Sequence, residues 1–288
     1  MKTLLYATDL STASADVAIY AYRLAQTLKA KLFICHTLNV PAEIPQSGPV
    51  PWPQEVYGNM ERDSKAELLK LKHKLVAAGD PAAYTPEIVC IQGVGLVTDV
   101  VNAEATHHQA DMIIMGTHAN GRLGTLLIGN HSRNMIEAAR FPLLLIPGGS
   151  TFHPIKRIAF GSDFKRPKLE LDAINQLITL AKTLHAELVL THIQKNKEAP
   201  AGNTIIKELL TDLVRSHGHQ QVSVKVVKSE HVAGGLAWLG QHAHIDLLAM
   251  AHNRHSFLEA LLHGSRTQQL AGKTPVPLLV FNSHQHEQ

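Results

Sequence analysis

The sequence predicts an α/β protein made of two tandem domains, each a doubly wound, Rossmann-like parallel sheet of five strands. Short apolar segments alternate with amphipathic helical segments, and the whole pattern occurs twice within 288 residues. Strands that alternate with helices pair in parallel, with helices covering both faces of the sheet. Sheets of this kind bind ligands beyond the carboxyl ends of their strands, at the point where the strand order reverses.

Internal similarity defines the two domains. Four pairs of segments match: 2–11 with 156–165, 32–37 with 188–193, 111–116 with 246–251, and 141–146 with 276–281. The offset between matched residues falls from 156 to 135, so the first copy has 21 additional residues. These residues map to the proline-rich stretch 41–58, which we expect to be a loop insertion and a candidate lid over a site. The domains are placed at residues 1–150 and 151–288.

Hydrophobic periodicity assigns the elements in order. Apolar runs predict the strands, and stripes such as Val17, Ala21, Leu24 and Leu28 predict the helices. The first copy is expected to form strands over 2–8, 32–38, 87–92, 112–116 and 143–146, and helices over 11–29, 61–78, 96–108 and 132–139. The second copy is expected to form strands over 157–161, 188–193, 222–228, 247–250 and 278–281, and helices over 169–185, 204–217, 232–244 and 265–271.

Composition excludes several classes of protein. Twenty-seven Lys and Arg against 24 Asp and Glu give a net charge of +3 without a basic block, so nucleic acid is not an expected partner. Apolar runs are far shorter than the roughly 18 residues of a membrane helix, and the first ten residues lack a secretory signal. We therefore expect a cytoplasmic protein in which Cys35 and Cys90 stay reduced. Histidine pairs such as His242 and His244 point to different helix faces, so no metal-binding or catalytic residue is assigned.

Two loops in each copy carry the predicted chemistry. In the first copy, Asp9 follows the first strand, and a glycine-rich loop from Gly116 to Ser132 follows the fourth strand and leads into a helix. Glycines let the backbone approach an anion, and the free N–H groups at a helix start donate to phosphate oxygens. A carboxylate in the place of Asp9 can accept both ribose hydroxyls. Together these features predict a nucleotide-binding site, with the phosphates at residues 129–132 and the ribose at Asp9. The alternatives are that Asp9 and Asp163 only cap helices and that the glycines only form turns.

These residues also carry a family resemblance: the chain resembles a tandem universal stress protein. Nucleotide-binding members of that family have Gly-x-x-Gly, nine residues, then Gly-Ser or Gly-Thr, together with an Asp after strand one and a His-hydrophobe pair ending strand two. The first copy has Gly116-x-x-Ala119, nine residues and Gly129-Asn130, with Ser132 at a further hydroxyl position. Ala119 lacks the conformational freedom of glycine, whereas Asn130 tolerates a left-handed conformation.

The second copy departs further from the family pattern. It has Ala251-x-x-Arg254, nine residues and Gly264-Ser265, with Thr267 at the hydroxyl position. Arg254 would either clasp a phosphate or fill the pocket. The resemblance implies adenine nucleotide alpha hydrolase-like domains, with adenine near Thr8 and Thr37 or near Ser162 and Ile193. The nucleotide-binding residues expected on this basis are Thr8, Asp9, Thr37, Met115, Gly116, Ala119, Gly129, Asn130, His131 and Ser132, and Ser162, Asp163, Ile193, Arg254, Gly264, Ser265, Arg266 and Thr267.

The resulting functional hypothesis is a stress-response sensor or regulator that binds ATP or another adenine nucleotide, with or without Mg²⁺. One alternative is a nucleotide-free interaction scaffold of the same fold. A third reading is a slow ATPase or adenylate-forming enzyme, for which His118, His131 or His252 would have to act as the base.

The last strand of each copy, 143–146 and 278–281, is apolar and would be an exposed edge in an isolated domain. We expect the two strands to pair within one chain as a pseudo-dimer, and two such chains could associate further as a homodimer.

Overall fold

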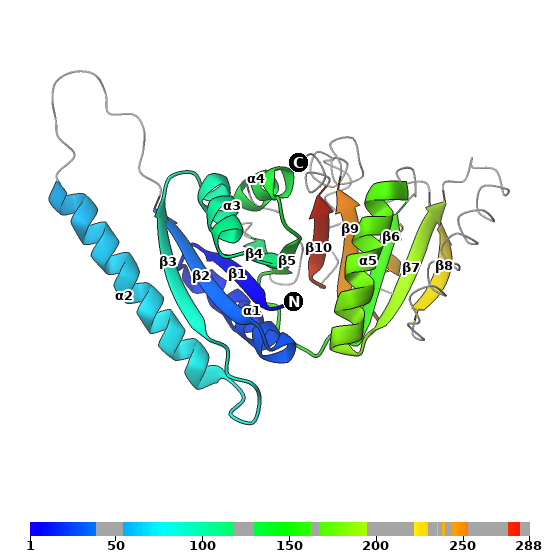
Figure 1. Ribbon diagram of the computed structural model, residues 1–288, viewed down its shortest axis with the longest axis horizontal. Helices are drawn as coiled ribbons and strands as arrows, with labels where there is room; N and C mark the ends of the chain where they lie inside the picture. The colour runs from blue at the N-terminus through cyan, green and yellow to red at the C-terminus, as the bar shows by residue number, and fades with distance from the viewer. Residues whose placement is uncertain are drawn as a thin grey trace, which may run out of the picture.

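Ten strands form one continuous sheet across the molecule (Figure 1). The computed structural model describes residues 1–38, 54–117, 130–162, 167–194, 222–229, 235, 238–239, 244–252 and 276–282. The strand order is β3-β2-β1-β4-β5-β10-β9-β6-β7-β8, and all strands within each half are parallel. Each half therefore has its order reversal between the first and fourth strands of the copy, which confirms two doubly wound α/β units.

The first copy forms every strand that its sequence predicts. Its elements are β1 (Thr3–Thr8), the 3-10 turn η1 (Thr12–Ser14), α1 (Ala15–Leu28), β2 (Lys31–Leu38), α2 (Gln54–Ala78), β3 (Ile88–Val94), α3 (Val97–His107), β4 (Met112–Thr117), α4 (Asn130–Ala138) and β5 (Leu143–Pro147).

The second copy repeats this order. Its described elements are β6 (Arg157–Ser162), α5 (Pro167–Leu184), β7 (Glu187–Gln194), β8 (Val222–Lys228), β9 (Leu247–His252) and β10 (Leu278–Asn282). The helices expected over 204–217 and 265–271 lie outside the described residues. Of the helix expected over 232–244, residues 235, 238 and 239 are described as helical.

One expected boundary is wrong. The loop insertion predicted over 41–58 ends earlier, because α2 begins at Gln54 and not at Glu61. Gly58 does not stop the helix, since one glycine within a helix costs only about 1 kcal/mol. The predicted lid falls on residues 41–53, which lie outside the described part of the chain.

The two halves are joined by the antiparallel pairing of β5 and β10, as their sequences predict. Leu278 lies opposite Leu145, Leu279 opposite Leu144, and Val280 opposite Leu143. All of these side chains are at most 2% exposed. The apolar edge that each domain would expose alone is therefore covered by the other domain, which removes two unpaired edges.

Each face of the sheet has its own core, and both cores cross the domain boundary. Alternate strand residues point to opposite faces, so Leu4 and Tyr6 join the core under α1, α2 and α5. Leu5 and Ala7 join the second core, under α3 and α4. The same alternation separates the two cysteines, because the register pairs Cys35 with Ile91 and Ile34 with Cys90. Both thiols are free.

A carboxylate at the start of each fourth strand holds the start of the neighbouring first strand. Asp111 Oδ2 accepts the backbone N–H groups of Lys2 and Thr3, at 2.6 and 2.9 Å. In the second copy, Asp246 Oδ2 accepts those of Lys156 and Arg157, at 2.8 and 2.9 Å. The sequence repeat aligns these two aspartates, and the structure gives the physical reason, which is a shared clamp at the amino ends of β1 and β6.

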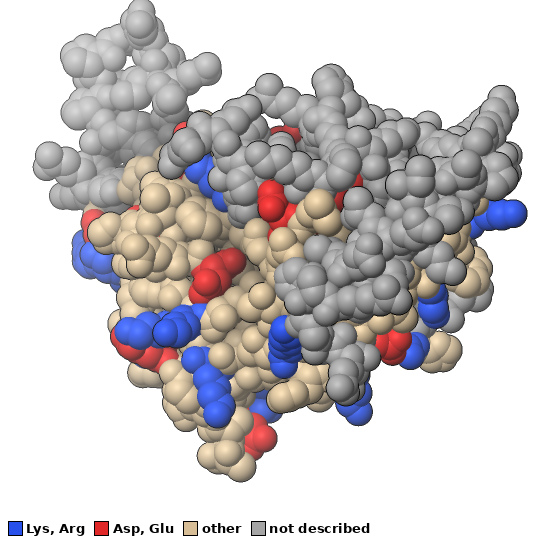
Figure 2. Space-filling model, turned by 45° about the vertical axis from the view of Figure 1, so that its right-hand side comes forward, with Lys and Arg blue, Asp and Glu red and all other residues tan. Residues whose placement is uncertain are grey.

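On the face shown in Figure 2, Lys and Arg side chains of the described residues are interspersed with Asp and Glu. None of the described helices combines the length and the hydropathy needed to cross a membrane.

We expect Asp246→Ala to lower the free energy of unfolding by about 1–3 kcal/mol, because two backbone donors lose a charged acceptor. Urea unfolding followed by circular dichroism measures this. Asp63→Ala, which removes an exposed carboxylate of α2, is the control and should change stability by less than about 0.5 kcal/mol. Equal effects of the two substitutions would contradict the clamp.

Candidate functional site

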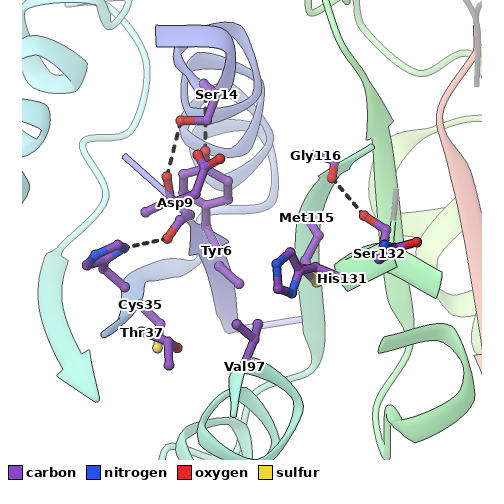
Figure 3. Close-up of a pocket in the computed structure, with 14 residues that line it drawn as sticks. Tyr6, Asp9, Ser14, Cys35, Thr37, Val97, Met115, Gly116, His131 and Ser132 are labelled. Atoms are coloured by element: carbon purple, nitrogen blue, oxygen red, sulfur yellow. Dashed lines mark hydrogen bonds between the residues drawn. The ribbon is translucent and has the colours of Figure 1, made fainter. Parts of the chain in front are cut away.

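A cavity of about 220 Å³ lies at the carboxyl ends of β1, β2 and β4, where the strand order of the first copy reverses (Figure 3). Its position is the one expected for a ligand site in a doubly wound sheet. The residues that line it are Tyr6, Ala7, Thr8, Asp9, Ser14, Cys35, His36, Thr37, Val97, Met115, Gly116, Asn130, His131 and Ser132.

Eight of the ten residues predicted for the first copy line this cavity. They are Thr8, Asp9, Thr37, Met115, Gly116, Asn130, His131 and Ser132. Ala119 and Gly129 lie outside the described residues. Reasoning from the sequence missed Tyr6, Ala7, Ser14, Cys35, His36 and Val97 as lining residues. The one available signal was His36, which recurs as His192 in the second copy.

The inner wall of the cavity is apolar. Ala7 and Cys35 come from adjacent strands, Met115 comes from β4, and Val97 begins α3. Burial, together with the nearby charge of Glu104, raises the pKa of the Cys35 thiol to about 12. The thiol is therefore neutral at physiological pH and behaves as a small apolar group. This wall suits a flat, weakly polar ring.

A hydrogen-bonded network fixes the loop that follows β1. The Tyr6 hydroxyl donates to the Ser14 carbonyl at 3.0 Å, and the Ser14 hydroxyl donates to the Ser11 carbonyl at 2.7 Å. The hydroxyls of Thr8 and Ser14 lie 3.3 Å apart, and Thr8 Oγ1 accepts the Leu10 N–H at 3.0 Å. Burial raises the pKa of Tyr6 to about 12, so its hydroxyl remains a donor. The network explains how Leu10 holds a left-handed backbone conformation with φ of 59°.

Asp9 stands exposed at the mouth of the cavity. Its Oδ1 accepts the N–H of Ser11 at 3.0 Å, which forms a turn of the kind that Asp side chains favour. The carboxylate thus supports the local backbone, as the helix-capping alternative supposed, although the bond goes to the N-cap residue Ser11 and not into the helix. Its position beside the cavity leaves it on the side from which a ligand would enter.

His36 joins the ends of β1 and β2. Its Nδ1 lies 2.8 Å from the Thr8 carbonyl oxygen. A carbonyl oxygen can only accept, so Nδ1 carries the proton in this bond, and Nε2 of the neutral ring is left as an acceptor. The ring is half-buried, and its bond fixes the carbonyl of Thr8, one of the two residues near which the family resemblance places adenine.

The other side of the cavity is the start of α4. The helix begins at Asn130, two residues before the predicted start, so Asn130, His131 and Ser132 form its first turn. Asn130 and His131 are exposed, and Figure 3 shows the His131 side chain turned toward the cavity. Ser132 is buried, and its hydroxyl donates to the Gly116 carbonyl at 3.0 Å. Ser132 therefore ties α4 to β4 in this conformation, and its hydroxyl proton is not directed to a phosphate.

Only part of the corresponding place in the second copy belongs to the described residues. The Ser162 hydroxyl donates to Glu170, a buried residue in the first turn of α5. Ile193, which matches the half-buried Thr37, is fully buried, and a Cβ added to Gly235 would lie 2.9 Å from its Cγ2. The remaining predicted residues of this copy, Asp163, Arg254, Gly264, Ser265, Arg266 and Thr267, lie outside the described residues.

Among the described residues, no group of three or more His, Cys, Asp or Glu side chains could hold a metal ion.

Comparison with known proteins identifies relatives of the whole chain. The model of the universal stress protein family matches twice, over residues 1–147 and 154–282. A universal stress protein from Archaeoglobus fulgidus DSM 4304 has a similar structure, with a TM-score of 0.71 and 16% identity over 97% of this chain and 98% of that chain. A putative universal stress protein from Pseudomonas aeruginosa UCBPP-PA14 gives a TM-score of 0.57 and 14% identity over 98% of this chain and 93% of that chain.

Other comparisons add less. A universal stress protein crystallised in complex with cAMP matches 50% of this chain and 96% of its own, with 22% identity and a TM-score of 0.38. No curated protein matches the chain in sequence.

The wall of the cavity predicts low reactivity of Cys35. A pKa of about 12 in place of 9.0 lowers the thiolate fraction at pH 8 about a thousandfold. We expect iodoacetamide to label Cys35 in the native protein far more slowly than in urea, as measured by mass spectrometry of peptides. Cys90 is half-buried and is the internal comparison. Labelling of native Cys35 at the rate seen in urea would contradict the assigned burial.

Proposed function

Because the chain belongs to the universal stress protein family and carries two of its domains in tandem, we propose that it binds ATP or a related adenine nucleotide in the first domain as a stress-response sensor or regulator. The observation that carries this proposal is one cavity with a carboxylate at its mouth on one side and a helix start on the other. Adenine is chosen among the bases because of the resemblance to nucleotide-binding members of the family. A cytoplasmic location stays a prediction.

The size of the cavity suggests which parts of a nucleotide it would enclose. Pockets that enclose whole ligands commonly measure about 300–1,000 Å³, and this one measures about 220 Å³. It therefore suits the base and part of the ribose. The apolar wall of Val97 and Met115 would contact the base, and Asp9 would accept ribose hydroxyls.

The phosphates would lie outside the enclosed volume, against the first turn of α4. The N–H groups of this turn have no partner within the helix, and the helix dipole adds partial positive charge there. Asn130 and His131 are exposed at this point and can donate to phosphate oxygens. Since Ser132 donates to Gly116, we assign the phosphate contacts to backbone N–H groups, Asn130 and His131 in preference to the Ser132 hydroxyl.

The first domain is chosen because eight of its predicted residues line one cavity, whereas most residues predicted for the second domain lie outside the described part of the chain. Thr37 is half-buried and faces the cavity, whereas Ile193 is fully buried against Gly235.

The test is the affinity for ATP measured by isothermal titration calorimetry, together with the nucleotide released when freshly purified protein is denatured. We expect about one nucleotide per chain, and we expect Asp9→Ala to weaken ATP binding about 10- to 100-fold, because a charged acceptor is lost. Asp16→Ala removes a neighbouring exposed carboxylate of α1 and should bind ATP as the wild type does.

Other outcomes would change the conclusion. Loss of ATP in Asp163→Ala alone would move the site to the second domain, and a wild-type protein that neither retains nor binds ATP would favour the scaffold alternative. Steady phosphate release that disappears in His131→Ala would replace binding alone with slow hydrolysis.

A further inference from the structure

The carboxyl end of α4 is held by two asparagine side chains, and one of them belongs to the second domain. Asn282, at the end of β10, donates through Nδ2 to the carbonyl oxygens of Ile136 and Ala139, at 2.9 and 2.8 Å. From the first domain, Asn102 Nδ2 donates to the Ala138 carbonyl at 2.9 Å. Asn282 is only 2% exposed. Carbonyls at the end of a helix have no partner within it, so these amides supply the missing donors.

The topology explains why Asn282 meets this helix. Because β5 and β10 run antiparallel with Val280 opposite Leu143, the end of β10 lies beside the start of β5. The chain enters β5 directly from α4, so the end of β10 faces the end of that helix (Figure 1). Side chains alternate along β10, and Asn282 shares with Val280 the face covered by α4.

The helix that Asn282 holds begins in the candidate site. From Asn130 to Ala138, α4 is a single nine-residue element of about 14 Å, with its first turn at the cavity and its last turn on the two amides. Its first turn is tied to β4 only through the Ser132 hydroxyl and the Gly116 carbonyl among the bonds described. Hydrogen bonds and rigid secondary elements are the physical means by which sites are coupled, and α4 connects the cavity to the two amides.

We infer that Asn282 is a positioning residue through which the second domain controls the ligand site of the first. By fixing the carboxyl end of α4, it sets where the N–H groups of residues 130–132 lie relative to β1 and β4. Anion binding at that turn then depends on correct pairing of the two domains. This inference rests on the proposed function in using ATP as the anion.

The sequence repeat does not provide the same donor to the second domain at the equivalent position. The residue equivalent to Asn282 in the first copy is Pro147, at the end of β5. Proline has no side-chain N–H group to donate. The second domain therefore supplies a side-chain donor to the first domain, and the equivalent residue of the first domain cannot donate to the second.

The test compares two variants of the full chain with similar effects on the β10 core. Asn282→Leu keeps the volume of the side chain but removes both donors. Leu279→Ala weakens packing of the same strand on the opposite sheet face, away from α4. We expect Asn282→Leu to raise the Kd for ATP about tenfold, within the range of couplings between sites, and Leu279→Ala to leave it within about twofold while lowering Tm at least as much. Asn282→Ser, which retains one hydroxyl donor, should fall between Asn282→Leu and the wild type.

A Kd in Asn282→Leu within twofold of the wild type, or an equal rise in Leu279→Ala, would overturn the inference. Amide chemical shifts of Gly116, His131 and Ser132 in ¹⁵N-labelled protein without ligand give a second readout. These chemical shifts should differ from the wild type in Asn282→Leu and should match the wild type in Leu279→Ala. If the wild type binds no ATP, the proposed function fails, and these shifts still decide whether Asn282 positions the first turn of α4. Unchanged shifts in both Asn282 variants would end the inference.

Discussion

The pairing of β5 with β10 is the constraint on which the rest of the structure depends. Each parallel half has an apolar last strand, and an exposed apolar edge would be open to pairing with any other chain. The backbone edges of β5 and β10 cover each other, and the cores on the two sheet faces bury the side chains of Leu143 to Ile146 and Leu278 to Phe281. The same pairing makes both hydrophobic cores continuous across the domain boundary, so the two copies form one sheet and one body. It also brings the end of β10 to the helix that opens the candidate site.

The candidate site has two sides that are held in different ways. The loop after β1 is held by bonds among Tyr6, Thr8 and Ser14, all of them at least nine-tenths buried. The first turn of α4 is held by Ser132 and, from its far end, by amides of both domains. A ligand that contacts both sides would therefore sense the relative placement of β1 and α4. In a sensor protein, this arrangement provides a physical route from ligand binding to the domain boundary.

The two copies have diverged in side chains while keeping their backbone plan. Asp111 and Asp246 make the same kind of clamp, because in each half the backbone N–H groups at the start of the first strand need an acceptor. At the carboxyl ends the pairs differ: Thr37 faces a cavity where Ile193 packs on a helix, and Asn282 donates where Pro147 cannot. The aspartate clamp has thus been retained in both copies, whereas these residues near the carboxyl ends of the strands have diverged.

The sequence by itself determined the ten strands, their parallel pairing within each half and the joining of two apolar edges, because these follow from local periodicity and from an internal repeat. It also indicated Asp9, Gly116 and the start of α4, since strand ends in a doubly wound sheet are known ligand positions. It missed that α2 begins at Gln54, because Gly58 is tolerated within this long helix. Only the tertiary structure decided that Cys35 and Val97 line the cavity, that Ser132 donates to Gly116, and that Asn282 reaches α4. These are contacts between residues up to 146 positions apart, and no local pattern encodes which polar group a buried donor will find.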